Sequence, residues 1–185
     1  GEASEGSYEI TVSSMASPEK MRSGTTYDTK NSDVMAGTLE ITLNGETDDT
    51  VIITIDEGDS VSTIADKINA SDAAVNATLI CDGSDYRLQV VAEETGFTTA
   101  TASEAMVITE NYTGVAGAQL NLSEVGTATN AVVNIDGLDM ESQPNALDDA
   151  LEGVTIDLAG IGTTSFTIAN DKVATKENIE AFVEV

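Results

Sequence analysis

The decapeptide STIADKINAS, residues 62–71, lies between segments that alternate like β-strands, although its own apolar residues follow a helical spacing. Together with the preceding valine they form one stripe at positions i, i+3, i+4 and i+7, namely Val61, Ile64, Ala65 and Ile68. Asp59 or Ser60 can cap this helix by accepting a backbone N–H bond. Because a helix of about two turns is unstable alone in water, we expect the stripe to pack on a sheet.

Two pairs of strands are predicted around this helix. Alternating or β-branched runs occupy residues 37–43, 51–55, 75–81 and 86–92. Turn signals join the members of each pair, at Asn44-Gly45 in the first and at residues 82–85 in the second. The pattern predicts a ββαββ unit whose helix packs across one face of a sheet.

The rest of the chain predicts more strands and a few short helices. Strands are expected at residues 7–14, 105–109, 118–122, 130–137, 154–158 and 164–168, with an irregular polar stretch at 15–33. Asn145 is expected to cap a short helix over residues 146–152, with Gly153 as its C-cap. A final helix is expected from Asp171 to residue 185, where it stops without a capping signal, so we expect the chain to be part of a longer protein. The predicted fold class is mainly β with short helices (α+β).

Charge and composition exclude several functions. The chain has 33 acidic and 7 basic residues, a formal net charge of −26, and no Lys, Arg or His between residues 88 and 171. Such a surface repels phosphate backbones, so we expect no nucleic-acid partner, and it also disfavours anionic lipid. We expect no membrane span, because no apolar stretch approaches about 18 residues, and we find no signal peptide.

The usual catalytic and metal-binding residues are scarce. The sequence has no His, and Cys81 is its single cysteine, which rules out an intrachain disulfide and predicts a small buried hydrophobic residue. Acidic runs at 56–59, 82–85 and 148–152 fit solvated turns and helix faces better than a metal or acid–base site. We therefore expect no enzyme activity, no cofactor and no metal.

Two stretches resemble a known family. The first, residues 61–96, resembles a module of flagellins and flagellar cap proteins, with its characteristic pairs at Ile68-Asn69, Asp82-Gly83 and Thr95-Gly96. The second, residues 130–158, is similar to the opening of the C-terminal part of the flagellar filament cap family (FliD, a hook-associated protein family), with matches at Asp136-Gly137, Asn145 and Gly153. Residues 8–23 also resemble the first strand of that family's inner domain.

The resemblance implies a domain arrangement. Residues 1–35 are the first part of an inner domain, 36–116 an inserted outer domain with the ββαββ module, 117–170 the second part of the inner domain, and 171–185 the start of a leg helix. In this arrangement the ten residues named in the two motifs have structural roles.

The resemblance also implies a function. It predicts a secreted, non-catalytic subunit of a ring at the flagellum tip, a pentamer or similar, exported through the flagellar route. Its implied partners are other copies of itself, flagellin, hook–filament junction proteins and host glycans. Two alternatives stay open at this point: a surface adhesin or glycan-binding module, and a fragment of a flagellin variable region. The small number of aromatic residues, four Tyr, three Phe and no Trp, counts against a glycan-binding platform.

Overall fold

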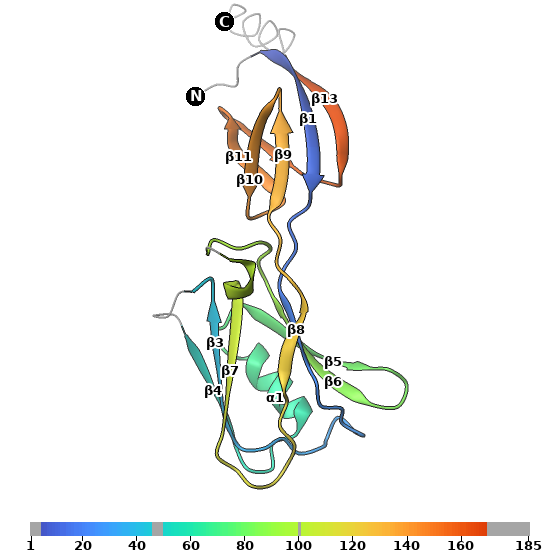
Figure 1. The fold of residues 1–185 in the computed structure, drawn as a ribbon, viewed down its shortest axis with the longest axis vertical. Helices are drawn as coiled ribbons and strands as arrows, with labels where there is room; N and C mark the ends of the chain where they lie inside the picture. The colour runs from blue at the N-terminus through green and yellow to red at the C-terminus, as the bar shows by residue number, and fades with distance from the viewer. Residues whose placement is uncertain (1–4, 46–49, 100, 170–185) are drawn as a thin grey trace, which may run out of the picture.

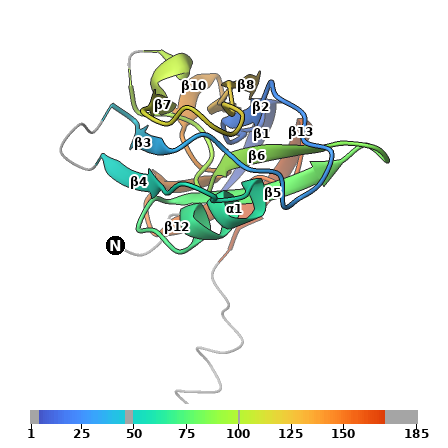
Figure 2. The ribbon, with the colours of Figure 1, turned by 90° about the horizontal axis from the view of Figure 1, so that it is seen from below.

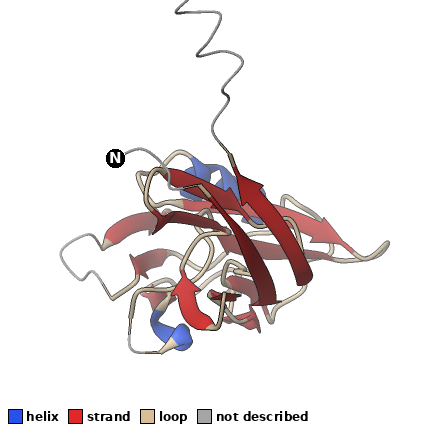
Figure 3. Cartoon of the chain, turned by 90° about the horizontal axis from the view of Figure 1, so that it is seen from above, coloured by secondary structure: helices blue, strands red, loops and turns tan. Residues whose placement is uncertain are grey.

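The computed structural model describes residues 5–45, 50–99 and 101–169. These residues form two bodies stacked along the long axis of the molecule (Figure 1). We call them the terminal body, made of β1 and β9–β13, and the central body, made of β2–β8 with the helices α1 and η2. Figure 3 shows that strands make up most of the regular structure.

The terminal body is a β-structure closed by segments from both ends of the chain. Its four-stranded antiparallel sheet has the order β10-β9-β1-β13, and β11 and β12 form a separate hairpin. The strands are β1 (Gly6–Ser14), β9 (Ala131–Ile135), β10 (Leu138–Ser142), β11 (Ala146–Leu151), β12 (Val154–Asp157) and β13 (Gly162–Ile168). Its core gathers Ile10, Val12, Ala16, Ala131, Val133, Ile135, Leu147 and Leu158.

The central body has two sheets and one α-helix around a second core. The sheets have the orders β5-β6-β2-β8 and β4-β3-β7. The elements are β2 (Lys20–Ser23), β3 (Gly37–Leu43), β4 (Val51–Ile55), α1 (Val61–Asn69), β5 (Val75–Cys81), β6 (Tyr86–Ala92), η2 (Ala102–Glu104), β7 (Met106–Tyr112) and β8 (Leu122–Gly126). The helix α1 contacts β5 from one sheet and β4 from the other (Figure 2).

The predicted helix and the four strands around it are confirmed. The structure forms β3, β4, β5 and β6 over the predicted residues, and Ser60 caps α1 by accepting a hydrogen bond from the Thr63 N–H (3.2 Å). All four residues of the apolar stripe are buried. The predicted packing on one sheet face is wrong, because β3 pairs with β7 and β6 with β2, so the two strand pairs belong to different sheets.

The prediction of a helix over residues 146–152 is wrong. These residues form the strand β11, which pairs with β12, and Gly153 lies in the turn of this hairpin with φ +73° instead of capping a helix. The spacing of Leu147 and Leu151, four residues apart, is compatible with one face of a short helix. In the structure Leu147 is buried because β11 pairs with β12 in a hairpin.

Three smaller predictions also change. Cys81 is exposed, not buried, because the β5–β6 hairpin extends beyond the core at its far end (Figure 1). The polar stretch 15–33 contains the strand β2, and the strand expected at 118–122 forms at residues 122–126 as β8. The expected helix from Asp171 to residue 185 lies outside the described residues. Among those that are described, no helix is long and apolar enough to cross a membrane.

Candidate functional site

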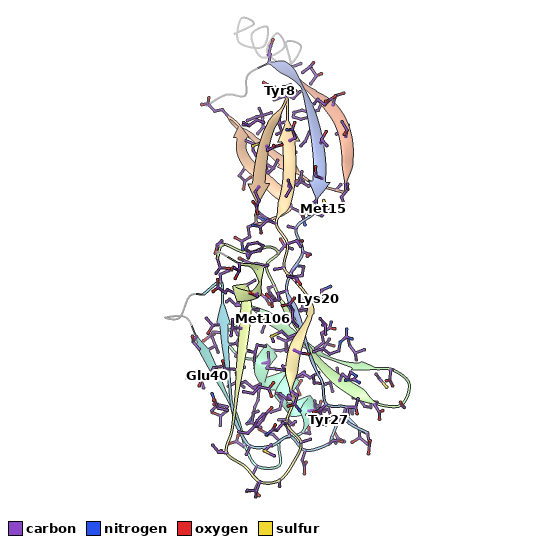
Figure 4. The ribbon with its side chains drawn as sticks, in the orientation of Figure 1. Tyr8, Met15, Lys20, Tyr27, Glu40 and Met106 are labelled. Atoms are coloured by element: carbon purple, nitrogen blue, oxygen red, sulfur yellow. The ribbon has the colours of Figure 1, made fainter. Side chains whose placement is uncertain are left out.

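The most distinctive site is the joint at which the two bodies meet. Residues 15–19 and 127–130 run side by side between the bodies, and Figure 4 labels Met15 and Lys20 on either side of it. Ser17 and Thr129 pair through both backbone hydrogen bonds (2.9 and 3.1 Å) and through their hydroxyl groups (2.8 Å). The two connections therefore support each other as a short two-stranded ribbon.

A loop of the central body reinforces this ribbon. The Gly96 N–H donates to the Ser17 carbonyl (3.0 Å), and the Thr95 hydroxyl donates to the carbonyl of Gln143 in the terminal body (3.1 Å). The side-chain amide of Asn130 accepts from the Phe97 N–H (2.8 Å) and donates to the Phe97 carbonyl (3.1 Å). Three successive residues therefore fasten the loop after β6, Thr95 to the terminal body and Gly96 and Phe97 to the two connections.

Gly96 is confined at this joint by both conformation and space. Its φ of +69° lies in the left-handed region, and a Cβ atom there would lie 2.3 Å from Asn130 Oδ1 and 2.5 Å from the Gln143 carbonyl oxygen. A side chain at this position would push the terminal body away from the loop. Gly96 therefore allows the two bodies to approach each other closely.

Asn145 fixes the first connecting segment. Its amide accepts from the Ala16 N–H (2.7 Å) and donates to the Ala16 carbonyl (2.9 Å), so one side chain pairs with a backbone residue as a neighbouring strand would. Its own carbonyl accepts from the Leu158 N–H (2.9 Å). Asn145 thus ties residue 16, near the start of the first connection, to the terminal body.

Glu19 is a buried carboxylate at the end of the first connection, next to the central body. Its side chain is 2% exposed and its Oε2 accepts a hydrogen bond from the Met106 N–H (3.1 Å). Burial raises the pKa of Glu19 above its ordinary value, the Met106 hydrogen bond opposes that rise, and the charge of Glu124 adds to it. The Glu19 carbonyl also accepts from the Ala92 N–H (3.0 Å), so this residue links β2, β6 and β7 below the joint.

The structure brings three of the ten motif residues, Thr95, Gly96 and Asn145, to the joint. Two others hold the helix in place: Ile68 is buried, and the amide of Asn69 pairs with both backbone groups of Ala77 on β5 (2.7 and 2.8 Å).

The remaining motif residues lie in hairpin turns away from the joint. Asp136 and Gly137, with φ of +47° and +89°, form the β9–β10 turn, and Gly153 forms the β11–β12 turn. Gly83, with φ +106°, and Asp82 lie at the β5–β6 turn. Hydrogen bonds from the N–H groups of Asp85 and Ser84 lower the pKa of Asp82 to about 2.

The joint has the properties of a mechanical site. The described residues contain no group of His, Cys, Asp and Glu side chains that would hold a metal ion. A cleft of about 490 Å³ near the joint is lined mainly by aliphatic side chains, with Asp72 and Glu94 as carboxylates. What the arrangement does is fix the orientation of one body relative to the other.

Comparison with known proteins agrees with this architecture. The family model for the flagellar hook-associated protein 2 C-terminus matches residues 128–185, and the flagellin hook IN motif matches residues 38–94. The crystal structure of FliD (HAP2) from Pseudomonas aeruginosa PAO1 superposes with a TM-score of 0.83 at 26% identity, over 100% of this chain and 88% of that one. In both sequence and fold the chain resembles the FliD (HAP2) flagellar cap proteins.

Other FliD proteins show the same similarity. The D2–D3 domains of the Escherichia coli flagellar cap protein FliD superpose with a TM-score of 0.77 at 27% identity, over 92% of each chain. The B-type flagellar hook-associated protein 2 of Pseudomonas aeruginosa is 26% identical over 204 residues, which cover 97% of this chain and 42% of that protein. The Salmonella typhimurium relative is 29% identical over 147 residues, 71% of this chain and 30% of that protein. The chain therefore spans less than half the length of these two hook-associated proteins.

Proposed function

We propose that this chain is the two-body part of a flagellar cap subunit, which promotes the polymerisation of flagellin at the filament tip. The observation that carries this proposal is the match to the D2–D3 domains of the Escherichia coli cap protein over 92% of each chain. The family models and relatives named above support the same role. The proposed mechanism is steric and non-covalent, without an enzymatic step.

The two bodies correspond, in this proposal, to an inner and an outer domain. The terminal body contains both ends of the described chain and acts as the inner domain, while the central body is inserted into it and faces outward. Because β2 and β8 pair with each other and β2 with β6, we place the boundaries of the inserted domain near residues 17 and 127, rather than at 36 and 116. Residues 171–185 begin the leg, outside the described residues.

The proposed partners follow from this role. Copies of the intact protein assemble into a ring, the ring contacts flagellin, and hook–filament junction proteins lie beneath it before the filament grows. The protein acts outside the cell, at the flagellum tip, after export through the flagellar route. The joint keeps the outer domains of all copies in one orientation, so that the ring has a defined shape.

Deletion of the parent gene tests this proposal. The deletion strain is expected to release unpolymerised flagellin into the medium and to carry no full-length filaments by electron microscopy. The intact wild-type gene supplied from a plasmid is expected to restore the filaments. Normal filaments in the deletion strain would contradict a cap function.

A further inference from the structure

The solvent side of the sheet β5-β6-β2-β8 carries an unusual set of charges. The chain has seven basic residues, and five lie in the described part: Lys20, Arg22, Lys30, Lys67 and Arg87. Lys67 pairs with Asp56 (2.7 Å) and Asp59 (2.5 Å). Met21, Leu88 and Val90 pack on the core, so the alternate residues Lys20, Arg22 and Arg87 point to the opposite side of the sheet. Three of the five described cations therefore share one sheet face.

Neutral groups hold the two arginines of this face. Arg22 Nη2 and Nε donate to Gln89 Oε1 (2.8 and 3.2 Å), and Arg87 Nη1 donates to the carbonyls of Gly24 and Ser23 (2.9 and 3.1 Å). Within the described residues no carboxylate lies within 4 Å of their cationic groups, although Asp82 feels the charge of Arg87 at longer range. A guanidinium group has five N–H donors, so both arginines keep donors free for a carboxylate partner.

The terminal body presents the opposite charge on a similar surface. Its described residues include no Lys or Arg. Ile10, Val133 and Ile135 point into its core, so the solvent side of the sheet β10-β9-β1-β13 carries Glu9, Asp139 and Glu141. Asp139 and Glu141 are each held by a neutral amide, from Asn134 (2.7 Å) and Asn130 (2.9 Å). Like the two arginines, Asp139 and Glu141 are held in place by neutral groups and have no cationic partner among the described residues.

We propose that the basic face, Lys20, Arg22 and Arg87, docks on the acidic face, Glu9, Asp139 and Glu141, of a second copy of this chain. The contact is head-to-tail, so it repeats from one copy to the next and forms a ring when the rotation between copies closes. Around these charges the two faces carry short polar side chains, such as Thr78 and Ser123 on one and Thr11 and Ser165 on the other. Each face also has an exposed aliphatic residue, Ile80 opposite Arg87 and Val132 opposite Glu141. Positioned guanidinium groups bind carboxylates with two parallel hydrogen bonds, which specifies the register of the contact. This inference rests on the proposed ring and names the surfaces that form it.

Sedimentation velocity of the intact protein separates this contact from a simple effect of net charge. The variant Asp139→Asn/Glu141→Gln removes two negative charges, and so does the control Asp28→Asn/Glu57→Gln at exposed positions elsewhere. If only general repulsion acted, both variants would associate more strongly than the wild type. The proposed contact predicts that Asp139→Asn/Glu141→Gln associates about tenfold more weakly than the wild type, which corresponds to about 1.4 kcal/mol, and that the control does not.

The basic face has its own matched pair. The variant Arg22→Gln/Arg87→Gln and the control Lys30→Glu both change the net charge by −2. We expect the arginine variant to associate about tenfold more weakly than the control. Circular dichroism verifies that each variant is folded.

A charge exchange provides the decisive variant. Arg22→Glu/Arg87→Glu combined with Asp139→Lys/Glu141→Lys leaves the net charge unchanged, and each half alone is expected to abolish association. The combination is expected to restore it to within about threefold of the wild type. If wild-type protein forms a ring and the acidic-face variant associates at least as strongly as its control, this contact is overturned while the ring stands. A wild-type protein that stays monomeric at every concentration overturns the ring as well.

Discussion

Gly96 shows how a single residue sets the distance between two bodies. Its left-handed backbone and the close approach of Asn130 and Gln143 both exclude a side chain. Gly58 has a similar φ of +87°, but no heavy atom lies within 4 Å of the position that a Cβ would take there, so it shares the backbone strain without the crowding. We expect Gly96→Ala to reduce the free energy of unfolding by about 1–3 kcal/mol more than Gly58→Ala does.

Urea unfolding followed by circular dichroism measures this difference. Hydrogen exchange provides a local check, because the amides of Ser17 and Thr129 are expected to exchange faster in Gly96→Ala and at the wild-type rate in Gly58→Ala. Equal losses of stability in the two variants would show that the crowding at the joint has no energetic effect.

Glu19 makes a pH-dependent contribution whose sign follows from its burial. Because its pKa is raised in the folded state, the folded protein binds this proton more tightly than the unfolded chain does. The favourable contribution of protonated Glu19 is complete below its unfolded pKa and is lost as the pH rises through the folded pKa.

Replacing Glu19 by Gln removes this titration while an amide oxygen still accepts from the Met106 N–H. We expect Glu19→Gln to be more stable than the wild type at pH 7, with a difference that narrows as the pH falls through the raised folded pKa and has stopped changing below the ordinary glutamate value of about 4.3. Urea unfolding of both proteins at several pH values tests this. A difference that is independent of pH would contradict the burial of an ionised group.

At the scale of elements, α1 is anchored by a lysine at its C-terminal end. Lys67 Nζ donates to Asp56, to Asp59 and to the Thr54 carbonyl (3.1 Å), and hydrogen bonds to Asp56 and Asp59 raise the pKa of Lys67 despite some burial. These contacts join the helix to the loop after β4. We expect Lys67→Met to cost about 1 kcal/mol of stability at low salt and less at about 1 M NaCl, because the pair is partly exposed. The exposed Lys30→Met serves as a control, and an equal cost for both would contradict the anchoring role.

The elements that the sequence predicts well are those whose signals are local. The helical stripe from Val61 to Ile68 and the alternation in β3 to β6 each specify their own structure within about ten residues. In β11 the local signal is ambiguous, and pairing with β12 decides in favour of a strand. Strand β2 has only four residues, and its partners β6 and β8 are far away in the sequence, so no local pattern marks it.

The joint is only partly predictable for the same reason. Thr95-Gly96 and Asn145 carry visible turn and cap signals, but their partners Gln143 and Ala16 lie 48 and 129 residues away. Asn130 has no signal of its own, since an asparagine at the start of a strand is compatible with any loop. The pairing of Ser17 with Thr129 depends on the whole topology.

At the scale of the whole molecule, charge opposes assembly. Copies with 33 acidic and 7 basic residues in this part alone repel one another, and this repulsion outweighs at long range the attraction of a few complementary charges. We therefore expect association of the intact protein to strengthen between about 0.05 and 0.5 M salt as the Debye length shortens. Sedimentation equilibrium measures it, and association that is independent of salt would contradict this expectation.

In the proposed function the chain works by shape, as two bodies held in one orientation at the tip of a filament. Electron cryomicroscopy of filament ends from cells producing the intact protein tests it most directly. We predict a ring of copies at the distal end, with the terminal bodies toward the filament, the central bodies outward, and the angle between them as in this structure. Filament tips without this protein, or copies whose two bodies adopt unrelated orientations, would contradict it.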